Sequence, residues 1–477
     1  MSSSLISSHR LPLKLGDKSF WRITLSLAIP IALQNMLAAS FSLIDTLMVG
    51  QLGDLPLSAT GMAGQWSWLF GMVLFGITSG AAVFVSQYWG DSNIKGIHRT
   101  IGIALSSGII LSILFFAVAI LFPKTVMSIF NQDPLIIEQG SIYLKYACFS
   151  YPAIALSNIL GGVLRSVERP RLPLLASGIS AAFNALLNYI LIFPAGLGVK
   201  GAAIATAISA WVAPILIIVV SLARKNILCA PMKDIFSFNG KSLLEFFRKA
   251  SPVIINETMW GMGTVAYQII FSNMGYEEYA ALTIIKPFEN FAFCFFLGLC
   301  NACCIMVGKE VGAGDIREAV RDTKRFLILM PLTSIIVGAC IVILRSPLVS
   351  LFNFGHNISE YAITTAESVL IICGVWYIVR NIPYLTVVGI FRPGGDTTMG
   401  MIIELLVLWA FSVPMTFIAA NVLNLPFITV YIIMYLCEDV PKAIIFLLYY
   451  KSGKWLKPVT EAGASALAEL KAKSVNS

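Results

Sequence analysis

The stretch IGIALSSGIILSILFFAVAILF, residues 101–122, decides the class of fold, because it runs for 22 residues without a charged side chain. An α-helix rises about 1.5 Å per residue, so roughly 20 apolar residues cross the ~30 Å hydrocarbon core of a bilayer. Apolar runs of similar length recur along the whole chain. A transmembrane β-barrel would instead show alternating segments of about ten residues. These runs therefore predict an all-α integral membrane protein.

The composition narrows the class of protein further. Of the 477 residues, 57% are hydrophobic and 12% are charged, and the mean hydropathy is +0.83. A soluble globular protein carries about 25% charged residues, so this chain has too few charges to cover a soluble surface of its size. These values exclude a soluble enzyme, a disordered protein and a nucleic-acid-binding protein, and they predict the lipid bilayer as a partner.

The apolar runs predict twelve transmembrane helices. The longest internal polar stretch, Arg224–Lys249, divides them into two groups of six. The predicted organisation is a first lobe at residues 1–223, a cytoplasmic linker at 224–248, a second lobe at 249–457 and a cytoplasmic tail at 458–477, expected to be a frayed helix. The predicted spans are 22–50, 57–88, 100–122, 141–164, 172–193, 199–223, 249–274, 279–308, 326–345, 362–391, 397–420 and 426–450.

Lysine and arginine residues predict the orientation in the membrane. Seventeen of them lie at the loops that follow even-numbered spans, and three lie at the loops that follow odd-numbered spans. Because loops rich in Lys and Arg stay in the cytoplasm, both termini are predicted to be cytoplasmic, at the inner membrane if the protein is bacterial. The net charge of +8 is then mostly a topology signal and requires no acidic partner.

The two halves of the chain form a weak internal repeat. Residues 30–99 align without a gap with residues 252–321, and Gly162-x-x-Arg165 aligns with Gly389-x-x-Arg392. Both halves begin on the same side of the membrane, so the repeat is parallel. A parallel repeat of six helices predicts two lobes around a central cleft. Two lobes that rock about such a cleft are the architecture of a secondary transporter.

Polar side chains inside the first lobe suggest an ion site. An ionisable group in hydrocarbon is costly and is a functional candidate by default. Asp45 lies in the first predicted helix, and Asn184 and Asn188 share one face of the fifth because they are four residues apart. A carboxylate with neutral oxygens suits a hard cation such as Na⁺, whereas a buried carboxylate can hold a proton. Interhelical hydrogen bonding explains the Asn pair equally well.

The second lobe carries more charge within its predicted helices. We expect Arg380 to be neutralised by Glu438 or Glu404, which leaves Glu257 or Glu289 to face a substrate or an ion. A buried network with a purely structural role is the alternative. The side chains that we expect to line the cleft are apolar, aromatic or acidic, which suits flat lipophilic cations, although some of them will be ordinary core or lipid-facing residues. They are Trp66, Met259, Trp260, Phe288, Glu289 and Tyr384.

Other chemistries find little support in the sequence. Most of the nine cysteines lie inside apolar runs, and the three histidines are scattered. No nucleophile–base pair is visible, and the one metal that the residues suggest is Na⁺ at Asp45. We therefore expect no enzymatic activity and no cofactor, and we expect a monomer. A passive channel is disfavoured because no pore-loop sequence is present.

Five sequence motifs resemble those of the multidrug and toxic-compound extrusion (MATE) family, in its bacterial NorM-like branch. Each motif is degenerate alone, but all five occur in order on the six-plus-six repeat, across roughly residues 20–457. They are Leu43-Ile-Asp-Thr-Leu-Met-Val-Gly50, Asn184-Ala-Leu-Leu-Asn188 followed by Gly196-Leu-Gly-Val-Lys-Gly201, Val307-Gly-Lys-Glu-Val-Gly-Ala-Gly-Asp315, Phe391-Arg-Pro-Gly-Gly-Asp-Thr397 and Lys451-Ser-Gly-Lys-Trp455.

The resemblance implies a secondary antiporter that exports organic, often cationic, compounds in exchange for Na⁺ or H⁺. It also implies that Asp45, Asn184, Asn188 and Thr206 couple the ion, with Glu257 as an acid of the second lobe. NorM-like members usually carry an Asp in the tenth helix, whereas residues 376–384 contain none. This departure argues against a NorM-like Na⁺ site in the second lobe. The alternative function is a related flippase for lipid-linked saccharides, which would need a basic cavity, whereas the helical charges here are net acidic.

Overall fold

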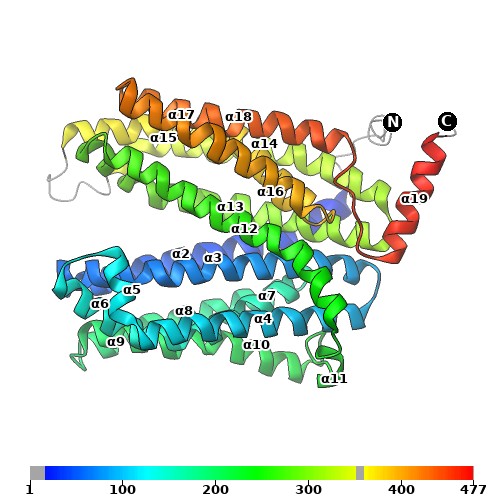
Figure 1. Cartoon of the computed structure of the whole chain (residues 1–477), viewed down its shortest axis with the longest axis horizontal. Coiled ribbons are helices and arrows are strands. Elements are labelled where there is room, and N and C mark those ends of the chain that lie inside the picture. Colours follow the sequence, from blue (N-terminus) through cyan, green and yellow to red (C-terminus); the bar gives the residue numbers. More distant parts are fainter. Residues whose placement is uncertain (1–16, 351–358, 476–477) are drawn as a thin grey trace. The chain divides into compact units, whose positions relative to one another are not determined.

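A computed structural model describes residues 17–350 and 359–475 of the chain (Figure 1). Every element in these ranges is helical. The α-helices are α2 (Lys18–Gly50), α3 (Asp54–Gly90), α4 (Ile94–Leu121), α5 (Pro123–Phe130), α6 (Pro134–Ala147), α7 (Tyr151–Ser166), α8 (Arg171–Ile192), α9 (Gly198–Ala210), α10 (Val212–Ala223), α11 (Met232–Ile235), α12 (Gly240–Ser272), α13 (Tyr276–Ala313), α14 (Ile316–Ser350), α15 (Glu360–Tyr384), α16 (Thr397–Leu405), α17 (Val413–Phe417), α18 (Phe427–Lys451) and α19 (Glu461–Val475).

Four shorter helical segments complete the described chain. A 3₁₀ turn, η1 (Cys148–Ser150), joins α6 to α7. Three π-helical segments occur near the end of the chain, namely η2 (Leu385–Phe391), η3 (Leu406–Ser412) and η4 (Ile418–Val422). Regular α-helices rarely contain π-helical turns, which are frequent at functional sites. Here η2 follows α15, which carries Arg380, and η3 follows α16, which carries Glu404.

The helices confirm the predicted membrane class. Within residues 17–350 and 359–475, ten helical stretches are long and apolar enough to cross a membrane. The other two predicted spans correspond to α12 and α18, which are long helices with more charged residues in their sequences. Several helices extend beyond the predicted bounds; α14, for example, runs from Ile316 to Ser350 rather than over 326–345. Polar helix ends explain this difference, because a hydropathy pattern detects the apolar part of a helix alone.

Local signals set several helix ends. The side chains of Asn93, Asp133 and Ser359 accept hydrogen bonds from backbone N–H groups in the first turns of α4, α6 and α15. Such N-caps satisfy amide groups that have no partner inside the helix. At the other end, α13 stops at Gly314, whose φ of 82° lies in the left-handed region that favours glycine. The sequence therefore specifies these boundaries without help from distant contacts.

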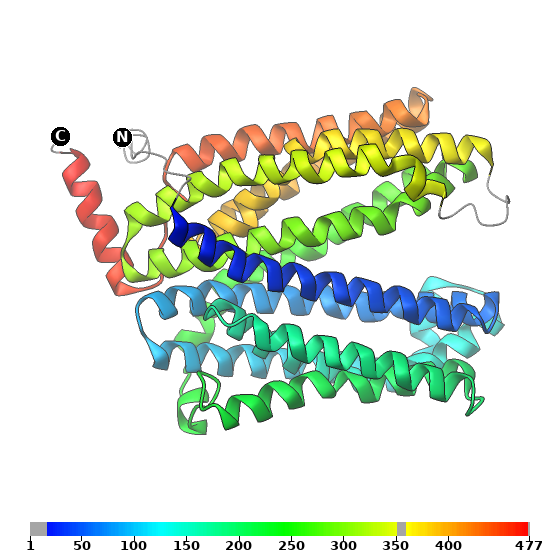
Figure 2. The same cartoon turned by 180° about the vertical axis from the view of Figure 1, so that it is seen from behind.

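The described chain forms two compact units. Of the described residues, one unit comprises 17–32, 90–92, 255–350 and 359–475, and the other comprises 33–89 and 93–254. Figure 2 shows from behind how the helices within each unit run alongside one another. Within the first of these units, α14 and α15 approach closely, since a Cβ atom added to Gly338 would overlap the carbonyl group of Gly374. Small residues let two membrane helices pack at short range.

Two hydrogen bonds at matching positions reflect the internal repeat. In one unit Gln34 Nε2 donates to Ser177 Oγ at 2.9 Å, and in the other Asn256 Nδ2 donates to Glu404 Oε2 at 2.8 Å. Gln34 aligns with Asn256 in the match of residues 30–99 with residues 252–321. Ser177 aligns with Glu404 at the same spacing along the chain that relates Arg165 to Arg392. The same contact, built from different side chains, thus occurs in both halves.

The predicted linker and tail both contain helices. Residues 240–248, which were predicted to belong to the linker, form the start of α12, and α11 lies in the same segment. The predicted frayed tail is the helix α19, whose Leu467 belongs to the hydrophobic core of its unit. Thr460, just before α19, donates to the carbonyl of Gly312 at 2.8 Å. An Ala-rich sequence is ambiguous, and the packing against α13 stabilises this helix.

Candidate functional site

The predicted ion-site residues of the first half come together in one unit. Asp45 lies on α2, Asn184 and Asn188 on α8, and Thr206 on α9. The Nδ2 group of Asn188 donates to Asp45 Oδ1 and to Asn184 Oδ1, the latter at 3.1 Å. Asn184 in turn donates to Ser209 Oγ at 2.9 Å. The structure therefore places Asp45 at one end of a chain of amide and hydroxyl groups.

Asn188 is the most enclosed member of this cluster. Its side chain is fully buried, and its carbonyl oxygen Oδ1 has no hydrogen-bond partner in the part of the chain that the structure describes. A buried acceptor without a partner costs about 1–3 kcal/mol. Beside a carboxylate, such an oxygen can accept a proton donor or coordinate a cation. Because the cluster carries a single carboxylate, its charge matches one monovalent cation or one proton.

Sequence reasoning missed two hydroxyl groups of this site. Tyr143 on α6 hydrogen-bonds Thr206 and lies close enough to Asp45 to interact with its charge. Ser209, one turn after Thr206, receives the hydrogen bond from Asn184. Both residues lie within predicted spans, but neither stands out as a functional candidate, because Ser and Tyr are common in membrane helices. The signal that was available is the spacing of Thr206 and Ser209, which places both near one face of α9.

Three cations of the second half pair with the acids that the sequence singles out in its predicted helices. Arg392 pairs with Glu257. Lys442 contacts Glu438 at 2.8 Å and Glu404 at 3.9 Å. The third pair joins Arg380 to Glu289 at 3.3 Å. Each cation therefore has at least one carboxylate partner.

The predicted partner of Arg380 is wrong. Arg380 was expected to pair with Glu438 or Glu404, yet both of these acids contact Lys442. Glu438 lies one helical turn before Lys442 on α18, so it reaches that cation within its own helix. Glu289 remains for Arg380 because α13, which carries it, packs against α15. Because Glu289 pairs with Arg380, it is not the unpaired acid that the sequence predicted.

Arg392 has a buried partner that its position in a loop does not predict. The sequence places it among the cytoplasmic loop residues that set the orientation, but its side chain is 3% exposed and paired with Glu257. The match between Gly389-x-x-Arg392 and Gly162-x-x-Arg165 is the signal that could have separated it from ordinary loop residues. In the other unit Arg165 donates to Gln34 Oε1 at 3.3 Å. Both arginines thus reach back to the polar positions of the first helix in their half.

Two more polar interactions connect this network to neighbouring helices. The Tyr267 hydroxyl lies 2.7 Å from Glu438 Oε2 and 2.7 Å from Ser412 Oγ. Asp439 accepts a hydrogen bond from the Trp376 indole N–H at 2.8 Å. Glu257, Glu289, Glu404, Glu438 and Asp439 are five acids, against the three cations Arg380, Arg392 and Lys442. The network is therefore net acidic when every group is ionised.

The predicted cleft-lining residues have different surroundings. Trp66 packs its ring 4.7 Å from the ring of Phe115, and its indole nitrogen is buried with no hydrogen-bond partner among the described residues. Met259 accepts a hydrogen bond at its backbone carbonyl from the Trp409 side chain. Trp260, Phe288 and Tyr384 pack, partly buried, against the hydrophobic core of the other unit. Of this predicted set, the structure links Glu289 to the charge network.

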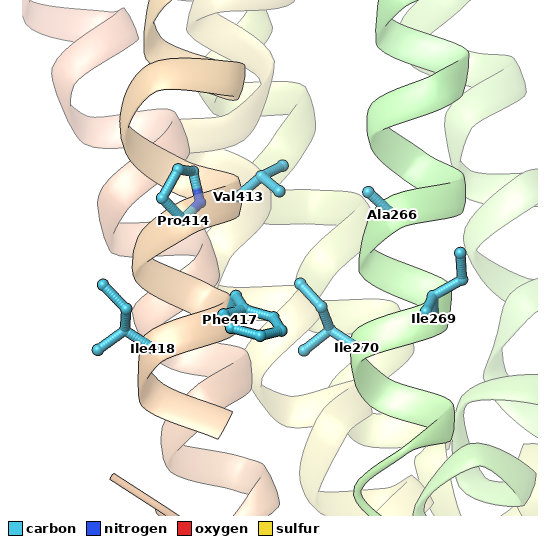
Figure 3. A pocket seen from close by; sticks show the side chains of 7 residues that line it. All are labelled: Ala266, Ile269, Ile270, Val413, Pro414, Phe417 and Ile418. Atoms are coloured by element: carbon cyan, nitrogen blue, oxygen red, sulfur yellow. The ribbon is translucent and has the colours of Figure 1, made fainter. Parts of the chain in front are cut away.

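An apolar pocket lies elsewhere, beside α12 and α17. It has a volume of about 480 Å³ and is lined by the seven side chains in Figure 3. Ala266, Ile269 and Ile270 come from α12, and the remaining four come from α17 and the start of η4. None of these residues belongs to the predicted cleft-lining set. With no polar side chain in its lining, the pocket can offer a ligand apolar contact alone.

The helices, the ion pairs and the Asp45 cluster define a polytopic membrane protein with charged sites inside its helical units. The MatE family model matches residues 30–190 and 252–418. The chain therefore belongs to the MatE family. The two matched segments correspond to the two halves of the internal repeat, as the resemblance in the motifs predicted.

Individual relatives agree with this assignment. The chain is 25% identical to the probable multidrug resistance protein NorM of Thermotoga maritima, over 91% of this chain and 92% of that protein. It is also 25% identical to the multidrug and toxin extrusion protein 1 of Oryctolagus cuniculus, over 93% of this chain and 77% of the relative.

Solved structures share the fold. A MATE protein crystallised in a bent conformation superimposes with a TM-score of 0.83 at 17% identity, covering 99% of both chains. A MATE transporter from Vibrio cholerae superimposes with a TM-score of 0.80 at 18% identity, covering 96% of this chain and 98% of the other. The predicted all-α membrane fold is thus confirmed.

Proposed function

We propose that this chain is a secondary antiporter that exports organic compounds, including compounds with a cationic group, in exchange for Na⁺ or H⁺. The single observation that carries the proposal is the Asp45 cluster. It combines one carboxylate in a membrane helix with the unpartnered oxygen of the fully buried Asn188. An antiporter needs a group that binds its driving ion in one conformation and releases it in another.

The donor set supports a monovalent ion. Asp45 supplies one negative charge, and the side chains of Asn184, Asn188, Thr206 and Tyr143 supply neutral oxygen atoms near it. Oxygen ligands suit Na⁺ as a hard cation, and the same carboxylate can instead carry a proton to the opposite side. Na⁺ and H⁺ are therefore both candidates for the coupling ion. In the other half of the chain, Glu257 is the candidate residue for binding that ion.

The remaining parts of the proposal follow from the family and from the loop charges. Residues 1–223 and 249–457 would act as two lobes that rock about a central cleft, with 224–248 as a cytoplasmic linker and 458–477 as a cytoplasmic tail. We infer a monomer that resides in the cell membrane, needs no cofactor, binds no nucleic acid and catalyses no reaction. A lipid-linked saccharide flippase fits less well, because the charge network is net acidic and would repel a pyrophosphate group.

Transport in proteoliposomes tests the proposal and identifies the ion. Purified protein is reconstituted into vesicles, a fluorescent organic cation is added outside, and either an outward Na⁺ gradient or an outward H⁺ gradient is imposed alone. We expect one of the two gradients to drive accumulation of the dye against its own gradient. Uphill flux under neither gradient, at a protein level that shows normal dye binding, would contradict the antiporter assignment.

Labelling of single cysteines tests the proposed orientation. In a Cys-less variant, one cysteine placed at 234–239 is expected to react with a membrane-impermeant maleimide only after the cells are opened. One placed at 275–278 is expected to react on intact cells. The reason is the excess of Lys and Arg at the loops assigned to the cytoplasm. The reverse labelling pattern would show that the termini lie outside.

A further inference from the structure

The predicted linker, residues 224–248, is folded onto one of the two compact units. The ring nitrogen Nε2 of His98 on α4 donates to the carbonyl of Ile227 at 3.0 Å, and Ile227 packs against the core of that unit. Helix α11 also packs against α4 (Figure 1). A Cβ atom added to Gly102 of α4 would overlap the carbonyl group of Ile235. The segment therefore has a fixed position on the helices of its unit.

The contact with α4 places the segment at the edge of the membrane. Gly102 is the second residue of the uncharged run 101–122, which is long enough to cross the hydrocarbon core. The carbonyl of Ile235 lies against α4 at this residue, so α11 is located where the apolar run begins. That level of a bilayer is the interface, where the headgroups meet the acyl chains.

The lipid-facing surface of α10 leads directly into the segment. The exposed side chains of α10 include Ile215, Val219 and Leu222, which are three or four residues apart and share one helix face. Exposed apolar side chains on a membrane-spanning helix contact lipid tails. The basic residues begin at Arg224, immediately after α10 ends. The segment thus continues the lipid-facing surface into the headgroup region.

The exposed side chains of the segment are both apolar and basic. Met232 and Phe236 are 67% and 54% exposed. At the start of α12, Lys241, Leu244 and Arg248 share one exposed helix face, and Leu244 is 71% exposed. Topology accounts for basic residues in a loop, but it gives no reason for large apolar side chains between them. Contact with water would be unfavourable for these apolar groups.

The charge of the segment favours an anionic surface. Residues 224–248 carry five basic side chains against the two acids Asp234 and Glu245, which leaves a net charge of +3. All five are exposed, and no ion pair within residues 17–350 and 359–475 involves them. Basic segments next to a membrane are attracted by anionic lipids. The five are Arg224, Lys225, Lys233, Lys241 and Arg248.

We propose that residues 224–248 form an interfacial anchor that binds anionic phospholipids. The five basic side chains contact the headgroups, and Met232, Phe236 and Leu244 insert at the boundary between headgroups and acyl chains. Apolar and basic side chains together are typical of segments that lie in the membrane interface. A cytosolic protein partner would need the apolar side chains to project away from the bilayer, whereas the contact of α11 with α4 holds them at its edge.

Quenching by spin-labelled lipid tests the depth of the anchor. In a Cys-less variant of the full chain, Met232→Cys carries an NBD fluorophore, and the protein is placed in nanodiscs of phosphatidylcholine and phosphatidylglycerol. A spin label on the acyl chain, near the headgroup, should quench this fluorophore. Lys95→Cys is the matched control, because Lys95 is exposed on the same helix α4 about 10 Å before Gly102, and its fluorophore should escape quenching. Equal quenching at both positions, or none at position 232, would overturn the proposal.

The same fluorophore measures the headgroup preference. In phosphatidylcholine nanodiscs at low ionic strength, spin-labelled phosphatidylglycerol should quench at about one-tenth of the fraction that spin-labelled phosphatidylcholine needs. High salt should weaken this preference, because it screens exposed charges. Equal quenching by the two lipids would overturn the proposal, as would a preference that salt does not change.

Variants assign the preference to the segment. Lys233→Gln should lower it about fivefold, since one basic side chain near an anionic surface contributes roughly that factor, and Lys233→Arg should retain it. Lys454→Gln is the matched control, because Lys454 is exposed in the other unit, and it should leave the preference unchanged. Full preference in Lys233→Gln, or its loss in Lys454→Gln, would contradict the assignment. No ion gradient is used, so the result does not depend on the proposed antiport.

Discussion

Asp45→Asn is expected to abolish uphill export while substrate binding stays within about twofold of wild type. The substitution keeps the size of the side chain and its ability to hydrogen-bond Asn188, but it removes the only charge of the cluster. Without that charge the site has no differential affinity for the driving ion, and a ligand with equal affinity for two conformations shifts neither. The measurement is dye accumulation in proteoliposomes under each gradient, together with equilibrium dye binding.

Asp133→Asn serves as the control for Asp45→Asn. Asp133 caps α6 through a hydrogen bond from the backbone of Leu135, and asparagine is an equally good N-cap. The control should therefore transport at the wild-type rate. Uphill flux of Asp45→Asn equal to wild type, at matched protein level, would remove Asp45 from the coupling site. The candidate would then move to the charge network that contains Glu257.

Glu257→Gln is expected to destabilise the folded protein by about 3–5 kcal/mol, the range found when one partner of a buried ion pair is removed. Arg392 is 3% exposed, so the loss of Glu257 leaves a buried positive charge without its nearest counter-charge. The double variant Glu257→Gln/Arg392→Gln removes both charges and should recover most of the lost stability. Thermal unfolding in detergent, followed by the monodisperse fraction, measures both effects.

The same variants separate a structural role of Glu257 from its predicted role in ion coupling. If Glu257 stabilises the unit through Arg392, export of cationic and neutral dyes should fall equally, in proportion to the folded protein. A Glu257→Gln variant of normal stability that loses uphill flux would instead support coupling. If the double variant is no more stable than Glu257→Gln, the unpaired charge of Arg392 is not the cause of the lost stability.

The amino-acid sequence by itself determined the membrane class, the helical spans and the repeat. These properties follow from local composition, because hydrocarbon penalises charge and unsatisfied backbone groups wherever they occur in the chain. Runs such as residues 101–122 can thus be recognised without any knowledge of their neighbours. The Asp45 cluster could also be predicted from the sequence. Asn184 and Asn188 lie one helical turn apart, and the motif resemblance adds Asp45 and Thr206.

Only the tertiary structure decided which charges pair. Arg380 and Glu289 are 91 positions apart, and Arg392 and Glu257 are 135 apart. Helical periodicity relates residues three or four positions apart, so it could identify Glu438 and Lys442 as neighbours but could not place Arg380. The packing of α15 on α13 and α18 made that choice. The same packing buried Arg392 beside Glu257 and left Arg380 exposed, because a side chain's surroundings depend on which helix lies beside it.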